Sequence, residues 1–143
     1  MVKVTREKFK TYQNVFDDFT NRNLFKLQTQ GYFDELLSPI ALGKEANVFS
    51  AKRKDGRLVV VKIYRLESCD FNKMYNYLRE DERYYNIKKN KRFIIFTWTQ
   101  REFRNLHKAR EADMKVPTPL HFSHNILIEE FIGKKEASPQ LKD

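Results

Sequence analysis

A β-hairpin over residues 47–65 constrains the fold of this chain more than any other feature of the sequence. The apolar period changes from about four to two, and the predicted strands Asn47–Lys52 and Arg57–Arg65 flank the turn Lys54-Asp55-Gly56. Asp-Gly between two strands is the strongest short hairpin signal. The second strand contains LVVVKIY, which is apolar on both faces except at Lys62. We therefore expect a strand covered on both sides that carries one cation.

Helical spacing is expected on the N-terminal side of this hairpin. The pattern turns helical over Asn14–Gln30, and we expect Thr20 to cap a helix that carries Leu24 and Leu27 on one face and ends at Gly31. A short helical piece is expected over Phe33–Leu37, ended by Ser38-Pro39.

The remaining strands and a second helix follow from local signals. A capping box with Thr97 as cap and Gln100 reaching back predicts a helix that runs through about Ala112. Residues 65–95 lack a sustained period and indicate a functional or mobile insertion, with some helix between Asn72 and Arg83. Three further strands are expected over Pro39–Gly43, Leu120–Phe122 and Ile126–Phe131. The fold class is therefore α+β.

The composition is that of one domain with a basic surface. The 143 residues include 28 Lys and Arg against 19 Asp and Glu, a formal net charge of +9. This charge favours a polyanionic partner and is equally compatible with an ordinary solvated surface. The single cysteine, Cys69, allows no internal disulfide, and no apolar run approaches the roughly 18 residues of a membrane span. We expect a cytoplasmic protein without a membrane partner.

Two charges are out of place in their predicted elements. Lys62 interrupts an apolar strand, and Glu102 interrupts a helical stripe formed with Trp98 and Leu106. Either charge by itself has an ordinary explanation, an edge lysine that reaches water or an exposed helix face. An ion pair between the two explains both at once, because a buried charge needs a partner.

The stretch ALGKEANVFSAK, residues 41–52, leads into the hairpin. It has one glycine and is followed by a strand, so it does not match a Walker A loop, which needs a second glycine and a following helix. By itself it is compatible with an exposed turn at Lys44 and Glu45. A strand lysine paired with a helix glutamate, behind a loop over phosphates, is the arrangement of a protein-kinase N-lobe.

Four segments are similar to the RIO-type atypical serine/threonine kinases, first subfamily. They are GKEANVF (43–49), VVKIYR (60–65), WTQREFRNL (98–106) and EEFIG (129–133). VFDDFTNRNLFKLQTQGYFDELLSPI, residues 15–40, resembles the N-terminal helical extension of that subfamily. The resemblance implies a five-stranded twisted antiparallel sheet with one packed helix, as residues 38–143, behind an extension of residues 1–37.

The resemblance also implies a role for each matching position. Lys62 would hold the ATP phosphates and Glu102 would fix the position of Lys62. Glu130 and Ile132 would present backbone groups to adenine. Ser68 is a weak candidate for autophosphorylation. The short nucleotide-binding loop would consist of Gly43, Lys44, Glu45, Ala46, Asn47 and Val48.

The sequence departs from the family pattern at several places. Ala41 and Leu42 replace two hydroxyl residues, and Glu129 replaces an apolar residue before the hinge. The sequence contains no H-x-D-x-x-x-x-N catalytic loop, and the Mg²⁺ ligands are expected from a C-lobe that these 143 residues do not include. We therefore assign no catalytic or metal-binding residue to this chain and expect no turnover from it in isolation.

Two functions remain open from the sequence. The first is the ATP-binding lobe of a RIO-type kinase or ATPase that acts in maturation of the small ribosomal subunit. The second is a non-catalytic module that binds RNA or a ribosome-assembly partner, for which the basic cluster Lys88–Arg92 beside Tyr84 and Tyr85 is suited. A solvated loop explains that cluster equally well.

Overall fold

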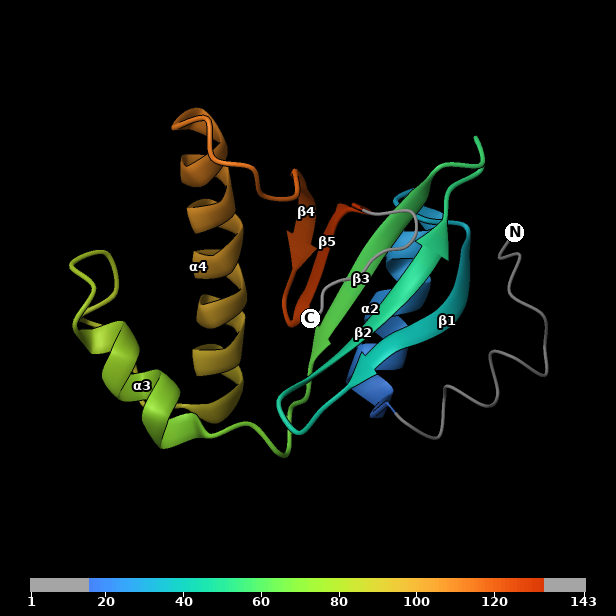
Figure 1. Ribbon diagram of the computed structural model, residues 1–143. Helices are drawn as coiled ribbons and strands as arrows, with labels where there is room; N and C mark the ends of the chain where they lie inside the picture. The colour runs from blue at the N-terminus through green and yellow to red at the C-terminus, as the bar shows by residue number, and fades with distance from the viewer. Residues whose placement is uncertain (1–15, 133–143) are drawn as a thin grey trace.

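A five-stranded antiparallel sheet forms the centre of the computed structural model, which describes residues 16–132. The strand order is β1-β2-β3-β5-β4, and the sheet is visibly twisted (Figure 1). The strands are β1 (Glu35–Leu42), β2 (Ala46–Lys52), β3 (Leu58–Tyr64), β4 (Pro119–Ser123) and β5 (Ile126–Glu130). The helices of the described residues are α2 (Asp18–Thr29), α3 (Phe71–Arg79) and α4 (Lys91–Glu111). The predicted α+β class and antiparallel sheet are confirmed.

Helix α2 covers one face of the sheet. It lies behind β2 and β3 in Figure 1, and its Leu24 and Leu27 are each 1% exposed. Alternate residues of the central strands meet these leucines, because successive strand side chains point to opposite faces. The resulting core contains Leu24, Leu27, Phe33, Leu36, Phe49, Ala51, Val59, Val61, Ile63, Ile126 and Ile128.

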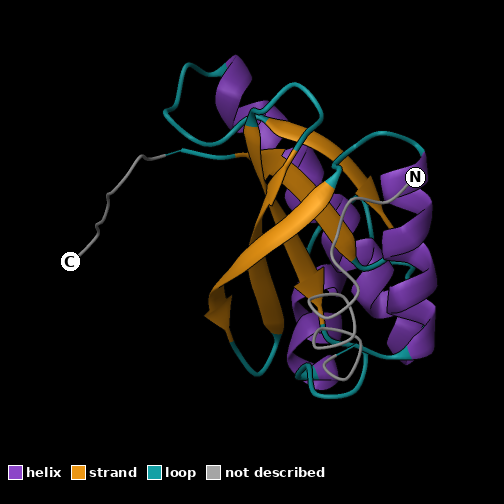
Figure 2. Ribbon diagram, turned by 90° about the vertical axis from the view of Figure 1, so that its right-hand side faces the viewer, coloured by secondary structure: helices purple, strands orange, loops and turns teal. Residues whose placement is uncertain are grey.

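A second apolar cluster joins α3 and α4 to the end of β3. Figure 1 shows α4 beside the β4 edge of the sheet and α3 on the side of α4 away from the sheet, and Figure 2 shows the helices and the sheet in a view turned by 90°. The cluster consists of Tyr64, Leu66, Cys69, Met74, Leu78, Tyr84, Ile94 and Ile95. Helix α2 therefore packs against the sheet through the first cluster, and α4 packs against the end of β3 through the second.

The predicted hairpin is present, with strands that agree within one residue of the expected bounds. Gly56 has φ +89°, a left-handed conformation that glycine adopts without strain. Asp55 accepts a hydrogen bond from the Arg57 amide at 3.0 Å, which closes the turn. The β4–β5 turn places His124 at φ 56°, in the left-handed region.

Three predictions about the N-terminal part of the described chain were wrong. Asp17, rather than Thr20, caps α2, and it accepts a hydrogen bond from the Thr20 amide at 2.7 Å. The expected helical piece over Phe33–Leu37 leads instead into β1, which begins at Glu35 rather than Pro39. Pairing of Leu36 with Ala51 of β2 explains this, because strand pairing buries Leu36 beneath α2.

The predicted start of the second long helix was also wrong. Asn90 caps α4 by accepting a hydrogen bond from the Phe93 amide at 3.0 Å, so Thr97 lies inside the helix. The two added turns bury Ile94 and Ile95. Residues 65–95 contain α3, where the sequence predicted some helix, and the first turn of α4.

Candidate nucleotide-binding site

The structure brings Lys62 of β3 and Glu102 of α4 together. The Lys62 Nζ atom lies 3.1 Å from Glu102 Oε2 and 3.3 Å from Oε1. The side chains are 26% and 27% exposed, so the pair is partly shielded and open on one side. A partly shielded pair is less screened by solvent than a surface pair, which favours a fixed position for the ammonium.

Tyr64 is a third member of this group that the sequence reasoning missed. Its hydroxyl donates a hydrogen bond to Glu102, and its ring lies 5.0 Å from the Lys62 ammonium. Burial and then the Glu102 charge raise the pKa of Tyr64, so the phenol stays protonated as a donor. The signal was the two-residue spacing from Lys62, which places both side chains on one face of β3.

Glu129 adds a further carboxyl to the same face of the sheet. Glu129 pairs with Val60, and Leu127 pairs with Lys62, so Glu129 lies diagonally across from the lysine. Burial raises the pKa of Glu129 to about 7; the Glu102 charge adds to this effect and Lys62 opposes it. The position that departs from the family pattern is therefore a half-buried carboxyl that titrates near neutrality.

The predicted nucleotide-binding loop is divided between the two faces of the sheet. The register pairs Val48 with Lys62 and Ala46 with Tyr64, which places Val48 and Ala46 on the lysine face. Asn47 is buried on the opposite face, where it lines a hollow of about 290 Å³ beside Asp17 and Ile63. Residues 43–45 are exposed at the tip, where the Gly43 amide donates to Ala46 O at 3.0 Å.

The remaining predicted site residues lie at the end of β5. The Glu130 amide donates to Thr118 O at 2.8 Å, and its carboxylate accepts hydrogen bonds from the Thr118 amide and hydroxyl at 3.1 and 3.0 Å. Ile132 is exposed at the end of the described residues. Their expected contacts with adenine stay predictions.

A hollow of about 350 Å³ opens beside the ion pair. Its lining includes two cations, Lys62 and Arg101, and this donor set fits an anionic phosphate chain. Mg²⁺ fits less well, because residues 16–132 contain no group of three His, Cys, Asp or Glu side chains that could hold a metal. The full lining is Lys62, Tyr64, Trp98, Arg101, Glu102, Asn105 and Leu106.

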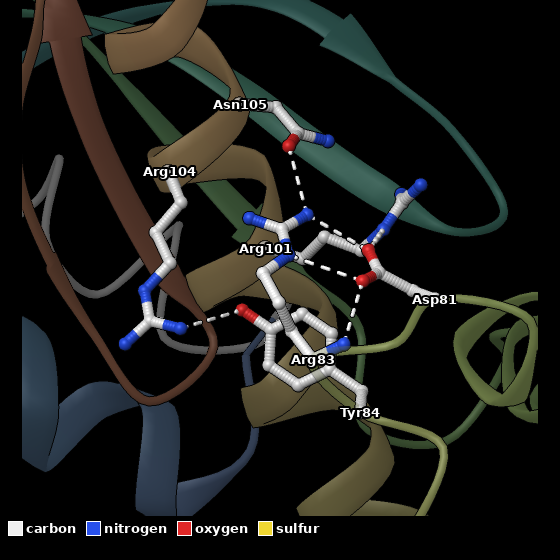
Figure 3. A network of polar contacts seen from close by, with 6 residues as sticks. All are labelled: Asp81, Arg83, Tyr84, Arg101, Arg104 and Asn105. Carbon is white, nitrogen blue, oxygen red and sulfur yellow. Dashed lines mark hydrogen bonds and ion pairs between the residues drawn. The ribbon is translucent and has the colours of Figure 1, made fainter.

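A polar network fixes the loop after α3 to the outer side of α4 (Figure 3). Asp81 Oδ2 lies 2.8 Å from Arg83 Nη2 and 3.1 Å from Arg101 Nε. Hydrogen bonds from Arg83 and Arg101 hold the pKa of Asp81 well below its usual range. Arg83 also donates to Asn105, and Arg104 donates to the Tyr84 hydroxyl, each at 3.1 Å. The segment that the sequence indicated as a functional or mobile insertion is thus bonded to the helix that carries Glu102.

The sheet, the helix beside it and the lysine–glutamate pair between them define the amino-terminal lobe of a protein-kinase-like fold. The RIO domain family model matches residues 47–143 of this chain. This match covers more than half of the sequence. The chain therefore belongs to the RIO domain family, and the resemblance seen in the sequence is confirmed.

Named relatives agree with this assignment. The RIO-type serine/threonine-protein kinase Rio1 of Haloferax volcanii is 42% identical over 127 residues, which cover 89% of this chain and 44% of that protein. Rio1 of Methanocaldococcus jannaschii is 38% identical over 138 residues, covering 96% and 47%. Serine/threonine-protein kinase RIO1 of Homo sapiens is 33% identical over 136 residues, covering 93% and 24%. The chain thus spans less than half the length of each of these relatives.

Within residues 16–132, no helix is both long enough and apolar enough to cross a membrane.

Proposed function

We propose that this chain is the ATP-binding lobe of a RIO-type serine/threonine kinase or ATPase. The observation that carries the proposal is the Lys62 ammonium, held by Glu102 and covered on one side by the Tyr64 ring, at the edge of an open hollow. An ammonium fixed in this way is suited to bind the α- and β-phosphates of ATP. Arg101, whose Nε is paired with Asp81, also lines this hollow.

The reaction of the whole enzyme would be phosphoryl transfer from Mg²⁺-ATP to a serine, or ATP hydrolysis. Mg²⁺ would neutralise charge on the phosphates when bound, and its ligands would come from outside residues 16–132. Lys62 would bind and orient the phosphates, and Glu102 would keep the ammonium in place. We further propose a cytoplasmic role in maturation of the small ribosomal subunit, by extension from the family.

Thermal unfolding with and without ATP tests nucleotide binding. We expect millimolar ATP to raise the Tm by a few degrees, because a ligand at 100 times its Kd stabilises the folded state by about 2.7 kcal/mol. Lys62→Ala should abolish this shift. Lys52→Ala is the matched control, because Lys52 is an exposed lysine of the neighbouring strand and should leave the shift unchanged. A shift that persists in Lys62→Ala would contradict the proposed site.

An assay for phosphorylation and ATP hydrolysis tests the expected lack of turnover. The purified chain should show no activity above background, because the sequence contains no H-x-D-x-x-x-x-N catalytic loop. Turnover that Lys62→Ala abolishes would overturn this expectation.

RNA binding is a second candidate function, favoured by cations that lie over aromatic rings on and around α3. Arg79 and Lys89 lie 5.6 and 5.3 Å from the Tyr75 ring centre, and Lys91 lies 5.1 Å from that of Phe71. Such pairs combine a basic surface with stacking groups. Binding of structured RNA with a steep salt dependence, together with no response to ATP, would favour this function over the first.

A further inference from the structure

Three consecutive carbonyl oxygens of the nucleotide-binding loop accept hydrogen bonds from one short segment after β3. The Arg65 guanidinium donates to Gly43 O at 3.1 Å, and the Ser68 hydroxyl donates to Lys44 O at 2.5 Å. Glu45 O accepts from the Arg65 amide at 2.9 Å and from the Cys69 thiol at 3.3 Å. The main chain of the loop tip is thus held from residues 65–69.

Residues 65–69 are anchored by burial and by the start of α3, although the loop tip that they contact is exposed. Leu66 and Cys69 are buried in the cluster formed with α3 and α4. Asp70 follows directly and caps α3 by accepting a hydrogen bond from the Lys73 amide at 3.1 Å. Residues 43–45 are exposed, so packing contributes little to their conformation. The donors of residues 65–69 therefore have a large share in fixing the loop.

Hydrogen bonds to the carbonyl oxygens of a loop that covers phosphates affect how the loop interacts with those phosphates. A carbonyl oxygen carries partial negative charge and repels a phosphate oxygen, whereas backbone amides and cations attract it. A donor on each of the three carbonyls lowers that repulsion and keeps the peptide groups in one orientation. Among these donors, the Ser68 hydroxyl makes the shortest hydrogen bond to the loop.

We infer that Ser68, together with Arg65 and Cys69, is a positioning residue for the phosphate-covering loop. It holds the main chain of residues 43–45 in the conformation that receives the phosphates of the nucleotide. This inference rests on the proposed function of the site. It adds a role for residues 65–69 that acts through the loop rather than by direct contact with the nucleotide.

Calorimetric binding of ATP and of adenosine to the whole chain tests the inference. Ser68→Ala should weaken ATP binding about fivefold to tenfold and change adenosine binding less than twofold, because adenosine lacks the phosphates. Ser68→Thr keeps the hydroxyl and should restore ATP affinity. Thr29→Ala is the matched control, because it removes an exposed hydroxyl that donates to the main chain at 3.0 Å far from the loop.

Amide hydrogen exchange of Gly43 and Arg65, whose amides donate to Ala46 O and Glu45 O, gives a second readout when it is measured without nucleotide. Exchange should be about tenfold faster in Ser68→Ala than in the wild-type chain and unchanged in Thr29→Ala. Unchanged exchange, unchanged ATP affinity, or an equal loss of ATP and adenosine affinity in Ser68→Ala would overturn the inference. Failure of the wild-type chain to bind ATP would instead overturn the proposed function, and with it the phosphate role of the loop.

Discussion

Glu129 places a second carboxyl, beside that of Glu102, near Lys62 of β3. The groups that face it are Lys62, which lowers its pKa, and Glu102, which raises it, while burial is the largest influence. Because its pKa is about 7, Glu129 in the folded protein is still protonated between about pH 4.5 and pH 7, where an ordinary glutamate, with a pKa of 4.5, has lost its proton. At the residue scale, this site therefore combines a fixed cation with a carboxyl that changes charge near neutral pH.

The titration of Glu129 predicts a pH-dependent stability. The pKa is raised on folding, so the contribution of Glu129 is fully present below about pH 4.5 and is lost as the pH rises to about 7. Glu129→Gln should remove this slope and raise the free energy of unfolding at pH 8 by on the order of 1–3 kcal/mol. Urea unfolding at pH 5 and pH 8 measures both effects. Glu82→Gln is the control, because Glu82 is exposed and its replacement should keep the wild-type slope.

At the element scale, two signals in the sequence favour different starts for helix α4. The capping box at Thr97 is a valid local signal, but the apolar run before it contains Ile94 and Ile95, which α3 and the end of β3 bury. Tertiary packing therefore extends the helix back to Asn90. A separate contact joins the segment before α4 to this helix, because Asp81 bonds to Arg101, one position before Glu102.

Replacement of each candidate cap distinguishes the observed helix start from the predicted one. Asn90→Ala should destabilise the protein by about 0.5–2 kcal/mol, because the Phe93 amide loses its acceptor. Thr97→Ala should be close to neutral or mildly stabilising, because alanine has the higher propensity inside a helix. Chemical unfolding of both variants provides the measurement. A larger loss for Thr97→Ala than for Asn90→Ala would contradict the observed start.

Helix α2 belongs to the folding unit of the sheet at the scale of the whole molecule. Its leucines share one core with Phe49, Val61 and Ile128 from three different strands. Asn125 in the β4–β5 turn donates to the Thr20 hydroxyl at 3.0 Å and to Tyr64 O at 2.9 Å. These two hydrogen bonds link α2 to the β4–β5 turn and to the end of β3. Residue 37, where the sequence analysis divides the extension from the lobe, lies within β1.

Two neighbouring residues of α2 test this shared core. Leu24→Ala should cost about 2–5 kcal/mol and lower the Tm of the whole domain in one cooperative transition. Phe25→Ala should change stability much less, because Phe25 is 55% exposed on the same helix. Thermal unfolding of both variants measures this difference. A local transition in Leu24→Ala, with the sheet unaffected, would contradict a shared core.

The sequence by itself determined the features that depend on local pattern. Strand period and Asp-Gly predicted the hairpin, and two misplaced charges predicted that Lys62 and Glu102 meet. Both inferences succeed because a buried charge requires a partner and a two-residue period assigns each side chain to a face.

Tertiary structure alone decided the features that depend on distant contacts. Strand pairing converted residues 35–37 into β1, and packing against α3 moved the start of α4 to Asn90. The donors of residues 65–69 on the nucleotide-binding loop join positions that no local pattern relates. The physical reason is that burial and hydrogen bonding reward contacts in space, whereas propensity and spacing report only neighbours along the chain.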